Sequence, residues 1–286
     1  MRSGVVVLVL LAACAPQKAP EVEYRGFGAP QRVAIRGYSG DAMEPFIARD
    51  GRYLFFNNSN DPKVDTNLHY AERIDELTFD YRGEVTGANS KALDGVASMD
   101  RAGNFFFIST RSYAESLSTL YRGRFAHGSL TGVELVAGVS LQRRGMVMFD
   151  AEVSPGGEVI FVVDGEFRGG PHPSSADIAV VVREGAGFRR HPASAKFMRN
   201  VNTAALEYAP AISTDLLELF FTRATGHQLV ICRSARRNRE EPFGVAERVA
   251  AITGHVEAPS LSGDGRSLYY HRLDGNRFVI YRVGRN

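Results

Sequence analysis

The stretch that decides the fold is Glu44-Pro45-Phe46-Ile47-Ala48-Arg49-Asp50-Gly51-Arg52-Tyr53-Leu54-Phe55-Phe56. It reads as an apolar strand, a tight turn at Asp50-Gly51, and a second, very apolar strand. Asp-Gly between two hydrophobic runs indicates a hairpin, because glycine adopts a positive φ without a Cβ clash. The stretch therefore predicts two adjacent antiparallel strands.

The same unit recurs along the chain at a spacing of about fifty residues, which is typical of propellers rather than of short solenoids. In the fourth copy, Leu216 stands where the others place glycine. The further copies span residues 96–108, 150–161, 209–221 and 258–270.

A third strand follows each hairpin, and a weaker fourth strand follows in four of the repeats, most clearly at residues 243–249. Four strands per repeat is the composition of a propeller blade. The last repeat ends without a fourth strand, but residues 27–33 mirror residues 243–249. The sequence therefore predicts an all-β propeller of five blades, in which an N-terminal strand completes the last blade and leaves no unpaired edge there.

Two of the turns carry a family resemblance. Ser154-Pro155-Gly156-Gly157 and Ser262-Gly263-Asp264-Gly265, each followed by an apolar strand, resemble the Ser-Pro-Asp-Gly repeats of TolB and related WD-repeat-like propellers of the periplasm. The other three repeats depart from this pattern at their turns. The resemblance implies a propeller over residues 26–286, and it does not imply an activity, because this fold hosts binders, scaffolds and enzymes.

Residues 1–14 read as a targeting segment, with Arg2 before a short apolar run. Leu11-Ala12-Ala13-Cys14 resembles a bacterial lipobox, which implies cleavage before Cys14 and lipidation of its thiol. Ala15 after the cysteine implies sorting to the outer membrane, on the side that faces the periplasm. Residues 15–25 read as a short tether.

Composition excludes several classes of function. A net charge of +2 does not favour nucleic acid or anionic lipid as a partner. Besides Cys14 the chain has only Cys232, in a strand-like run, so we expect a buried, inert thiol and no internal disulfide. No nucleophile elbow, zinc-protease motif or phosphate loop is present.

Polar residues gather in the loops that open on one face of such a ring. Acids precede or begin the first strand of every repeat, and further polar residues follow the second strands. The candidate ligand-binding residues are Glu44, Asn58, Asp94, Asp150, Asp164, His172, Glu207, Arg223, Glu257 and His271. Because first strands line the central channel, we expect Glu44, Asp150, Glu207 and Glu257 to share one face near its mouth.

These residues admit three interpretations. Paired acids such as Glu44, Asp150 and Glu257 could hydrolyse a glycosidic bond, with one acid raised in pKa and another ionised. Alternatively, the acids only hydrogen-bond backbone amides and arginines around a wet channel. Finally, His271 and the pair His255 and Glu257 could bind a metal, but their spacing does not define a site, so we expect neither metal nor cofactor.

The first hypothesis is therefore a lipid-anchored, non-catalytic propeller of the cell envelope that binds a protein, a peptide or a small polar ligand. The alternatives are a glycoside-acting enzyme and a structural partner within an envelope complex. Under this hypothesis the protein contacts the membrane through its lipid anchor only. Whether the protein catalyses a reaction is left open by the sequence.

Overall fold

The computed structural model describes residues 26–61, 63–226 and 228–285. The signal segment, Cys14 and the tether lie outside these residues, so their assignment stays a prediction. None of the described helices is long and apolar enough to cross a membrane.

The described residues form four hydrogen-bonded sheets, and the largest of them joins two units through one parallel pair, Ala176 and Leu206. Twenty of the described strands thus make five antiparallel units of four, which succeed one another along the chain. The first unit contains β3 (Met43–Ile47), β4 (Tyr53–Asn57), β5 (Leu68–Arg73) and β6 (Thr78–Glu84). The second contains β7 (Asp94–Met99), β8 (Asn104–Ser109), β9 (Leu120–Ala126) and β10 (Ser129–Leu135).

The third unit contains β11 (Met146–Val153), β12 (Val159–Glu166), β13 (Ser175–Glu184) and β14 (Gly187–Arg190). The fourth contains β15 (Leu206–Ile212), β16 (Glu218–Thr225), β17 (Gln228–Ala235) and β18 (Glu247–Arg248). The fifth contains β19 (Val256–Leu261), β20 (Ser267–Asp274), β21 (Arg277–Gly284) and, from the start of the chain, β1 (Gln31–Arg32). Short helices α1 (Tyr113–Ser116) and α2 (Ser194–Met198) lie in connections.

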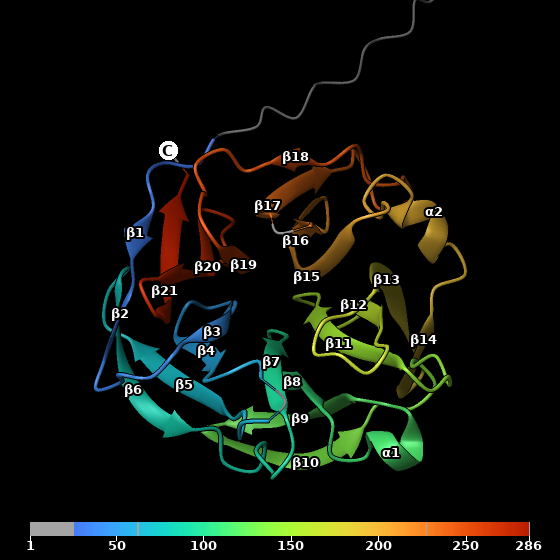
Figure 1. Cartoon of the computed structure of the whole chain (residues 1–286), viewed down its shortest axis with the longest axis horizontal. Coiled ribbons are helices and arrows are strands. Elements are labelled where there is room, and N and C mark those ends of the chain that lie inside the picture. Colours follow the sequence, from blue (N-terminus) through green and yellow to red (C-terminus); the bar gives the residue numbers. More distant parts are fainter. Residues whose placement is uncertain (1–25, 62, 227, 286) are drawn as a thin grey trace, which may run out of the picture.

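The units stand around a common centre, with their first strands innermost, as Figure 1 shows. The chain is therefore a β-propeller, and we interpret each unit as a blade.

The core is divided among the interfaces between neighbouring blades. Phe55 packs with Phe105 and Phe107 of the second blade, whereas Leu54 and Phe56 on the same strand pack with the fifth. Successive residues of a strand point to opposite faces, so a second strand covered on both sides must be apolar throughout. This explains the continuous apolar runs of the sequence.

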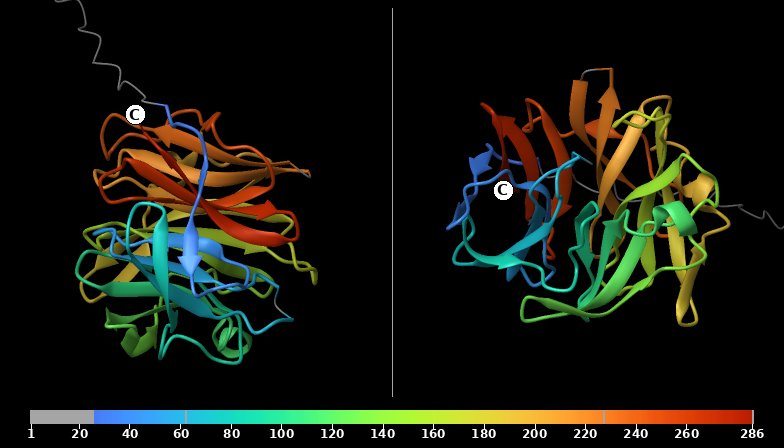
Figure 2. Two further views of the ribbon diagram at one scale, coloured as in Figure 1. Left: turned by 90° about the vertical axis from the view of Figure 1, so that its left-hand side faces the viewer. Right: turned by 60° about the horizontal axis from the view of Figure 1, so that its bottom comes forward.

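The N-terminal segment joins the last blade to the first. Gln31 and Arg32 of β1 pair with Arg282 and Tyr281 of β21, as the sequence predicts. β2 (Ala34–Arg36) then pairs in parallel with β6 of the first blade. The left view of Figure 2 shows this segment, in blue, running from the red strands toward the first blade. The ring is thus closed through hydrogen bonds on both sides of the seam.

The hairpin turns share one backbone requirement. Gly51, Gly103, Gly157 and Gly265 all adopt φ between +72° and +82°, and Leu216 takes the equivalent position at +66°. Leu216 is 2% exposed and packs in the core between the third and fourth blades. A left-handed conformation costs a side-chain-bearing residue roughly 1–2 kcal/mol, and burying a leucine recovers about 1.5–3 kcal/mol. Burial therefore outweighs backbone propensity at this turn.

One predicted strand is shorter than expected. Of residues 243–249, only Glu247 and Arg248 form ladder pairs with β17. Gly244 N–H and Val249 N–H still donate to β17, at Ala235 O and Ile231 O, and Phe243 is buried against the third and fourth blades. Cys232 is buried as predicted, and burial raises the pKa of its thiol.

Candidate functional site

A bulge in the innermost strand of each blade decides which side chains face the axis. The pairing register shifts within each of these strands, for example between Met43 and Phe46 and between Glu257 and Ser260. Residues at the bulges adopt a positive φ: Glu44, Val96, Ala209 and Ala258. Bulges bend a strand and re-aim its side chains. Glu44 and Asp150 each lie three residues before the last residue of their strands, Ile47 and Val153, and so occupy equivalent positions.

Three of the predicted acids and one histidine come together at the axis. One carboxylate oxygen each of Glu44 and Glu257 and a ring nitrogen of His271 lie within 4.8 Å of one another. Asp150 interacts electrostatically with both Glu44 and Glu257. We call these four residues the axial cluster. Glu44, Asp150 and His271 are at most 8% exposed, so the cluster is largely shielded from water.

The hydrogen bonds of His271 determine its protonation. The backbone N–H of Glu44 donates to His271 Nδ1 over 3.1 Å. Because an amide N–H can only donate, Nδ1 must accept, and the proton of the neutral ring is on Nε2. Burial lowers the pKa of His271 to about 3, in agreement with a neutral ring. Nε2–H is buried and has no hydrogen-bond partner among the described residues.

The carboxyl groups of the axial cluster are difficult to ionise. Burial raises the pKa of Asp150 to about 7, and it raises that of Glu44 well above its ordinary value, with added repulsion from Asp150 and Glu257. Burial also raises the pKa of Glu257, although the hydroxyl of Tyr208 donates to its Oε2 over 3.1 Å. No lysine or arginine in the described part of the chain forms an ion pair with any of these three acids. Burial and mutual repulsion therefore oppose ionisation of the cluster near neutral pH.

The channel itself is nearly filled by side chains. A cavity of about 30 Å³ lies on the axis, lined among others by Glu44, Asp150 and Glu152. A space of this size holds roughly a water molecule or one hydroxyl group. Farther along the axis, Arg49 Nη2 donates to Glu152 Oε1 and to Val153 O. The body of any larger ligand would therefore lie outside the channel, at its mouth.

Three other predicted acids are held in ion pairs away from the axial cluster. Arg111 donates to Asp94, which also accepts from Ser90. In the fourth blade Arg223 donates to Glu207, which accepts likewise from Thr203. These two arrangements are the same structural motif, because the carbonyl six residues before each acid, Ala88 O and Val201 O, accepts from the same arginine. Asp164 is bound by both terminal nitrogens of Arg190.

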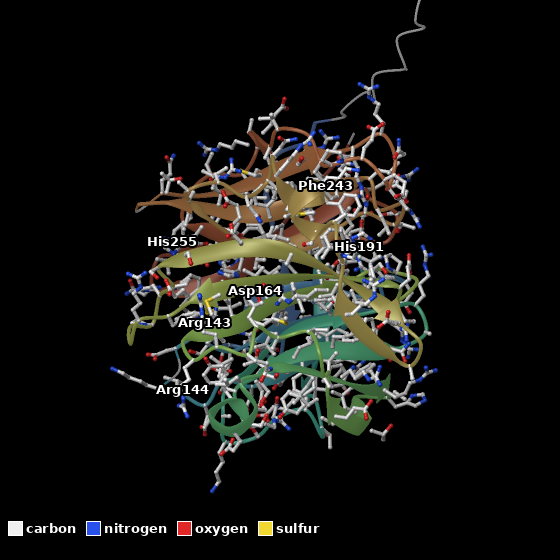
Figure 3. All side chains as sticks on the ribbon, turned by 90° about the vertical axis from the view of Figure 1, so that its right-hand side faces the viewer. Arg143, Arg144, Asp164, His191, Phe243 and His255 are labelled. Atoms are coloured by element: carbon white, nitrogen blue, oxygen red, sulfur yellow. The ribbon has the colours of Figure 1, made fainter. Side chains whose placement is uncertain are left out.

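The last two candidates lie in loops. Asn58 accepts from Asn67 N–H and donates to Asp65 O, so its side chain stabilises the loop in which it lies. His172 is exposed and acts electrostatically on Glu257. Figure 3 shows His255, Arg143 and Arg144 toward one face of the disc and His191 and Phe243 toward the other. The face of His255 is the one onto which the axial cluster opens.

The sequence did not single out two neighbours of the cluster. Asn60 donates to Glu44 Oε1 over 2.7 Å, and Tyr208 donates to Glu257. The signal for Tyr208 is present in the repeats: Tyr208-Ala209-Pro210 aligns with Glu257-Ala258-Pro259, so both side chains precede the same bulge. Asn60 lies in a loop without a repeated pattern.

The hydrogen bonds argue against His271 as a metal ligand, although Glu44, Glu257 and His271 lie close enough to surround an ion. A ligating imidazole offers one lone pair and donates from its other nitrogen. Here Nδ1 is occupied by the Glu44 N–H and Nε2 carries the proton. The site presents a donor where a metal would need an acceptor.

The raised pKa values predict that the protein loses stability as the pH rises. Below about pH 4 the buried acids carry protons in both states, so they do not change stability. Between about pH 4 and the raised values the unfolded chain releases protons that the folded chain keeps, so the free energy of unfolding falls. Asp150→Asn should therefore stabilise the protein at about pH 8 by about 1 kcal/mol or more, and less at about pH 5, since each pKa unit corresponds to about 1.4 kcal/mol.

Thermal unfolding at several pH values checks this. Acids whose pKa is lowered, such as Glu72 and Asp80, stabilise the folded state at neutral pH. They lose this contribution to the free energy of unfolding only as the pH falls through those lowered values. Between about pH 4 and 6.5 the lowered pKa values of His69 and His271 act in the opposite direction, so the difference between Asp150→Asn and the wild type, rather than the wild-type profile alone, isolates the acid. Exposed Glu115→Gln is the control and should leave the pH profile unchanged. A profile for Asp150→Asn that runs parallel to the wild type would contradict the prediction.

Comparisons with known proteins show the fold of this chain and nothing beyond it. No protein-family model matches the sequence, and no curated protein matches it significantly. Among solved structures, the family 117 glycoside hydrolase Zg3597 of Zobellia galactanivorans matches with 12% identity and a TM-score of 0.59, over 91% of this chain and 90% of that one. Another solved glycoside hydrolase matches with 11% identity and a TM-score of 0.61, over 92% of this chain and 93% of its own. These likenesses confirm the propeller.

TolB from Acinetobacter baumannii also matches, with 15% identity and a TM-score of 0.47, over 86% of this chain. The chain spans about half of TolB, since the match covers 54% of its length. The propeller fold is shown by the two glycoside hydrolase structures, and the resemblance of the repeats to the TolB family stays a prediction.

Proposed function

We propose that this protein is a binding propeller that holds a small, polar, hydroxyl-bearing ligand at the axial cluster and does not transform it. The observation that supports this proposal is the proximity of a buried Nε2–H on His271, which has no hydrogen-bond partner among the described residues, to acids whose pKa values are raised. An unsatisfied buried donor costs roughly 1–3 kcal/mol. A hydroxyl group accepts from Nε2–H and donates to a carboxyl oxygen, so it satisfies both groups without introducing charge.

The experiment is calorimetric titration with neutral mono- and oligosaccharides, polyols and short peptides. We expect a hydroxylated compound to bind. Glu44→Gln and Glu257→Gln should each weaken it by roughly two- to tenfold, because a hydrogen bond between neutral groups is worth about 0.5–1.5 kcal/mol. Glu115→Gln should bind as the wild type does. Absence of binding across the panel, or tight binding of Ca²⁺ or Zn²⁺ that the two variants abolish, would overturn the proposal.

A glycoside-acting enzyme is the second candidate, and the proximity of Glu44 and Glu257 favours it. Their oxygens lie within 4.8 Å, near the roughly 5–5.5 Å of retaining glycosidases and short of the roughly 6.5–9.5 Å of inverting ones. Chromogenic glycosides and envelope polysaccharides should nevertheless show no turnover. Hydrolysis that Glu44→Gln, Asp150→Asn or Glu257→Gln reduces by orders of magnitude would replace the binding proposal with this one.

We further propose that the protein is exported and anchored in a cell-envelope membrane through lipid on Cys14, as the sequence of the first fourteen residues predicts. Partners would then be envelope proteins, peptides or small polar ligands. Cys14→Ser should release soluble protein, and metabolic labelling with a fatty-acid probe should mark the wild type alone. An unlabelled wild-type protein that begins at another residue would refute the anchor.

A further inference from the structure

A cleft of about 590 Å³ opens between the last two blades, beside the axial cluster. It is bounded by the last residue of β16, by the first two residues of β17, by β18 and by the residues that precede β19. Its lining residues are Thr225, Gln228, Leu229, Arg248, Gly254 and His255. This volume lies within the roughly 300–1,000 Å³ of small-molecule sites, whereas the axial cavity accepts only a single group.

His255 connects the cleft to the axial cluster. It lines the cleft, and its Nε2 lies 3.4 Å from Oε1 of Glu257. The other oxygen of Glu257 accepts from Tyr208. A ligand seated in the cleft therefore lies next to the most accessible carboxyl group of the cluster, whose side chain is 17% exposed.

The chemistry of the lining favours a negative charge. Arg248, Gln228, Thr225 and His255 can all donate hydrogen bonds, and none of the lining residues is acidic. The guanidinium of Arg248 makes only a 3.4 Å contact with Ile252 O and has no carboxylate partner among the described residues. Arg111, Arg190 and Arg223 are by contrast each bound to an acid. Arg248 is therefore available to a ligand.

We propose that the cleft binds the carboxylate of a hydroxylated acid, such as an acidic sugar, while a hydroxyl group of the same molecule reaches the axial cluster. The inference rests on the proposed binding function for the hydroxyl part and adds the charge of the ligand. A guanidinium matches the two oxygens of a carboxylate. One fixed positive charge in the cleft complements a monoanion better than a phosphate dianion.

Matched ligands test this directly. Calorimetric titration would compare glucose with glucuronate and galactose with galacturonate, and would include glucose 6-phosphate. The wild type should bind each acid roughly tenfold or more tightly than its neutral partner, because a charge-assisted hydrogen bond is about twice as strong as one between neutral groups. The preference should weaken in high salt, since exposed charges are screened.

Variants of Arg248 test whether this residue causes the preference for the acidic sugar. Arg248→Gln should bring the ratio between acid and neutral sugar close to one, because it removes the positive charge of the cleft. Arg248→Lys should restore part of the preference, because an ammonium keeps the charge but not the paired geometry. Arg237→Gln is the control, since Arg237 is an exposed arginine outside the lining of the cleft.

The outcomes separate the two proposals. Equal binding of neutral and acidic sugars by the wild type would refute the anion site and leave the binding function in place. Tighter binding of the phosphate would show that the ligand class is wrong. A preference that survives Arg248→Gln would place the anion elsewhere. If no sugar binds at all, the proposed function and this inference both fail.

Discussion

Deleting residues 26–34 is expected to remove the cooperative folding of the ring at physiological temperature. The deletion takes away β1 and the first residue of β2, and so opens the seam between the last blade and the first. Gly28 N–H no longer donates to Gly284 O, Val33 N–H to Ile280 O, or Ala34 N–H to Leu77 O. It also leaves the outer edge of β21 unpaired, which invites association with other chains.

The packing lost with these residues is large. Phe27 lies edge-on to Phe220 at 5.8 Å and under the guanidinium of Arg285 at 4.7 Å. The fourth blade contains the same arrangement, with Arg236 over Phe243 at 4.4 Å. Three hydrogen bonds at about 1 kcal/mol each and a half-buried phenylalanine at about 2 kcal/mol together approach the roughly 5–15 kcal/mol that stabilise a whole domain.

Thermal unfolding and size-exclusion chromatography measure the effect. The deletion variant should show no sharp transition and should associate. Phe27→Ala should lower the free energy of unfolding by about 1–3 kcal/mol, since the side chain is only partly buried. Val245→Ala is the matched control from the repeat segment that mirrors residues 27–33, because Val245 is 81% exposed and contributes little. An unchanged midpoint in the deletion variant would mean that the seam does not stabilise the ring.

The fold was predictable because its signals repeat. Positive φ at the turn is required in each blade, and glycine meets it in four of them. The remaining turn, in the fourth blade, shows the limit of the pattern. Leu216 adopts the same positive φ there, and its side chain is buried in the core. The continuous apolar second strands follow from coverage on both faces. Each of these signals depends on local chemistry that the sequence carries directly.

The site was less predictable, because a one-residue difference in position changes which way a side chain points. Asp94 and Glu207 lie one position before the register shift, opposite Ser109 and Arg223. Glu257 lies at the shift, opposite His271. Acids that looked equivalent in the sequence therefore separate into structural ion pairs and members of the axial cluster. The bulge that separates them is marked by a proline in three blades, at Pro45, Pro210 and Pro259, but not in the other two.

Arg49→Met is expected to destabilise the protein by about 3–5 kcal/mol, the cost of leaving a buried charge without its partner. The side chains of Arg49 and Glu152 are 3% and 5% exposed, and they join the first blade to the third across the axis. The other carboxylate oxygen of Glu152 accepts from Ser98 Oγ over 2.8 Å, and Ser98 Oγ in turn accepts from Val153 N–H. Methionine fills the space of the arginine stem but leaves Glu152 ionised and uncompensated.

The double variant Arg49→Met/Glu152→Gln distinguishes charge from packing. A neutral glutamine still accepts from Ser98 and needs no cation, so the double variant should recover most of the stability that Arg49→Met loses. Denaturant unfolding of the wild type, both single variants and the double variant gives the coupling energy of the pair. A coupling near zero would mean that Arg49 stabilises the ring through its stem and its bond to Val153 O alone. A large coupling would show that a charge pair holds this end of the axis, in contrast to the axial cluster, whose three acids form no ion pair with a lysine or arginine of the described residues.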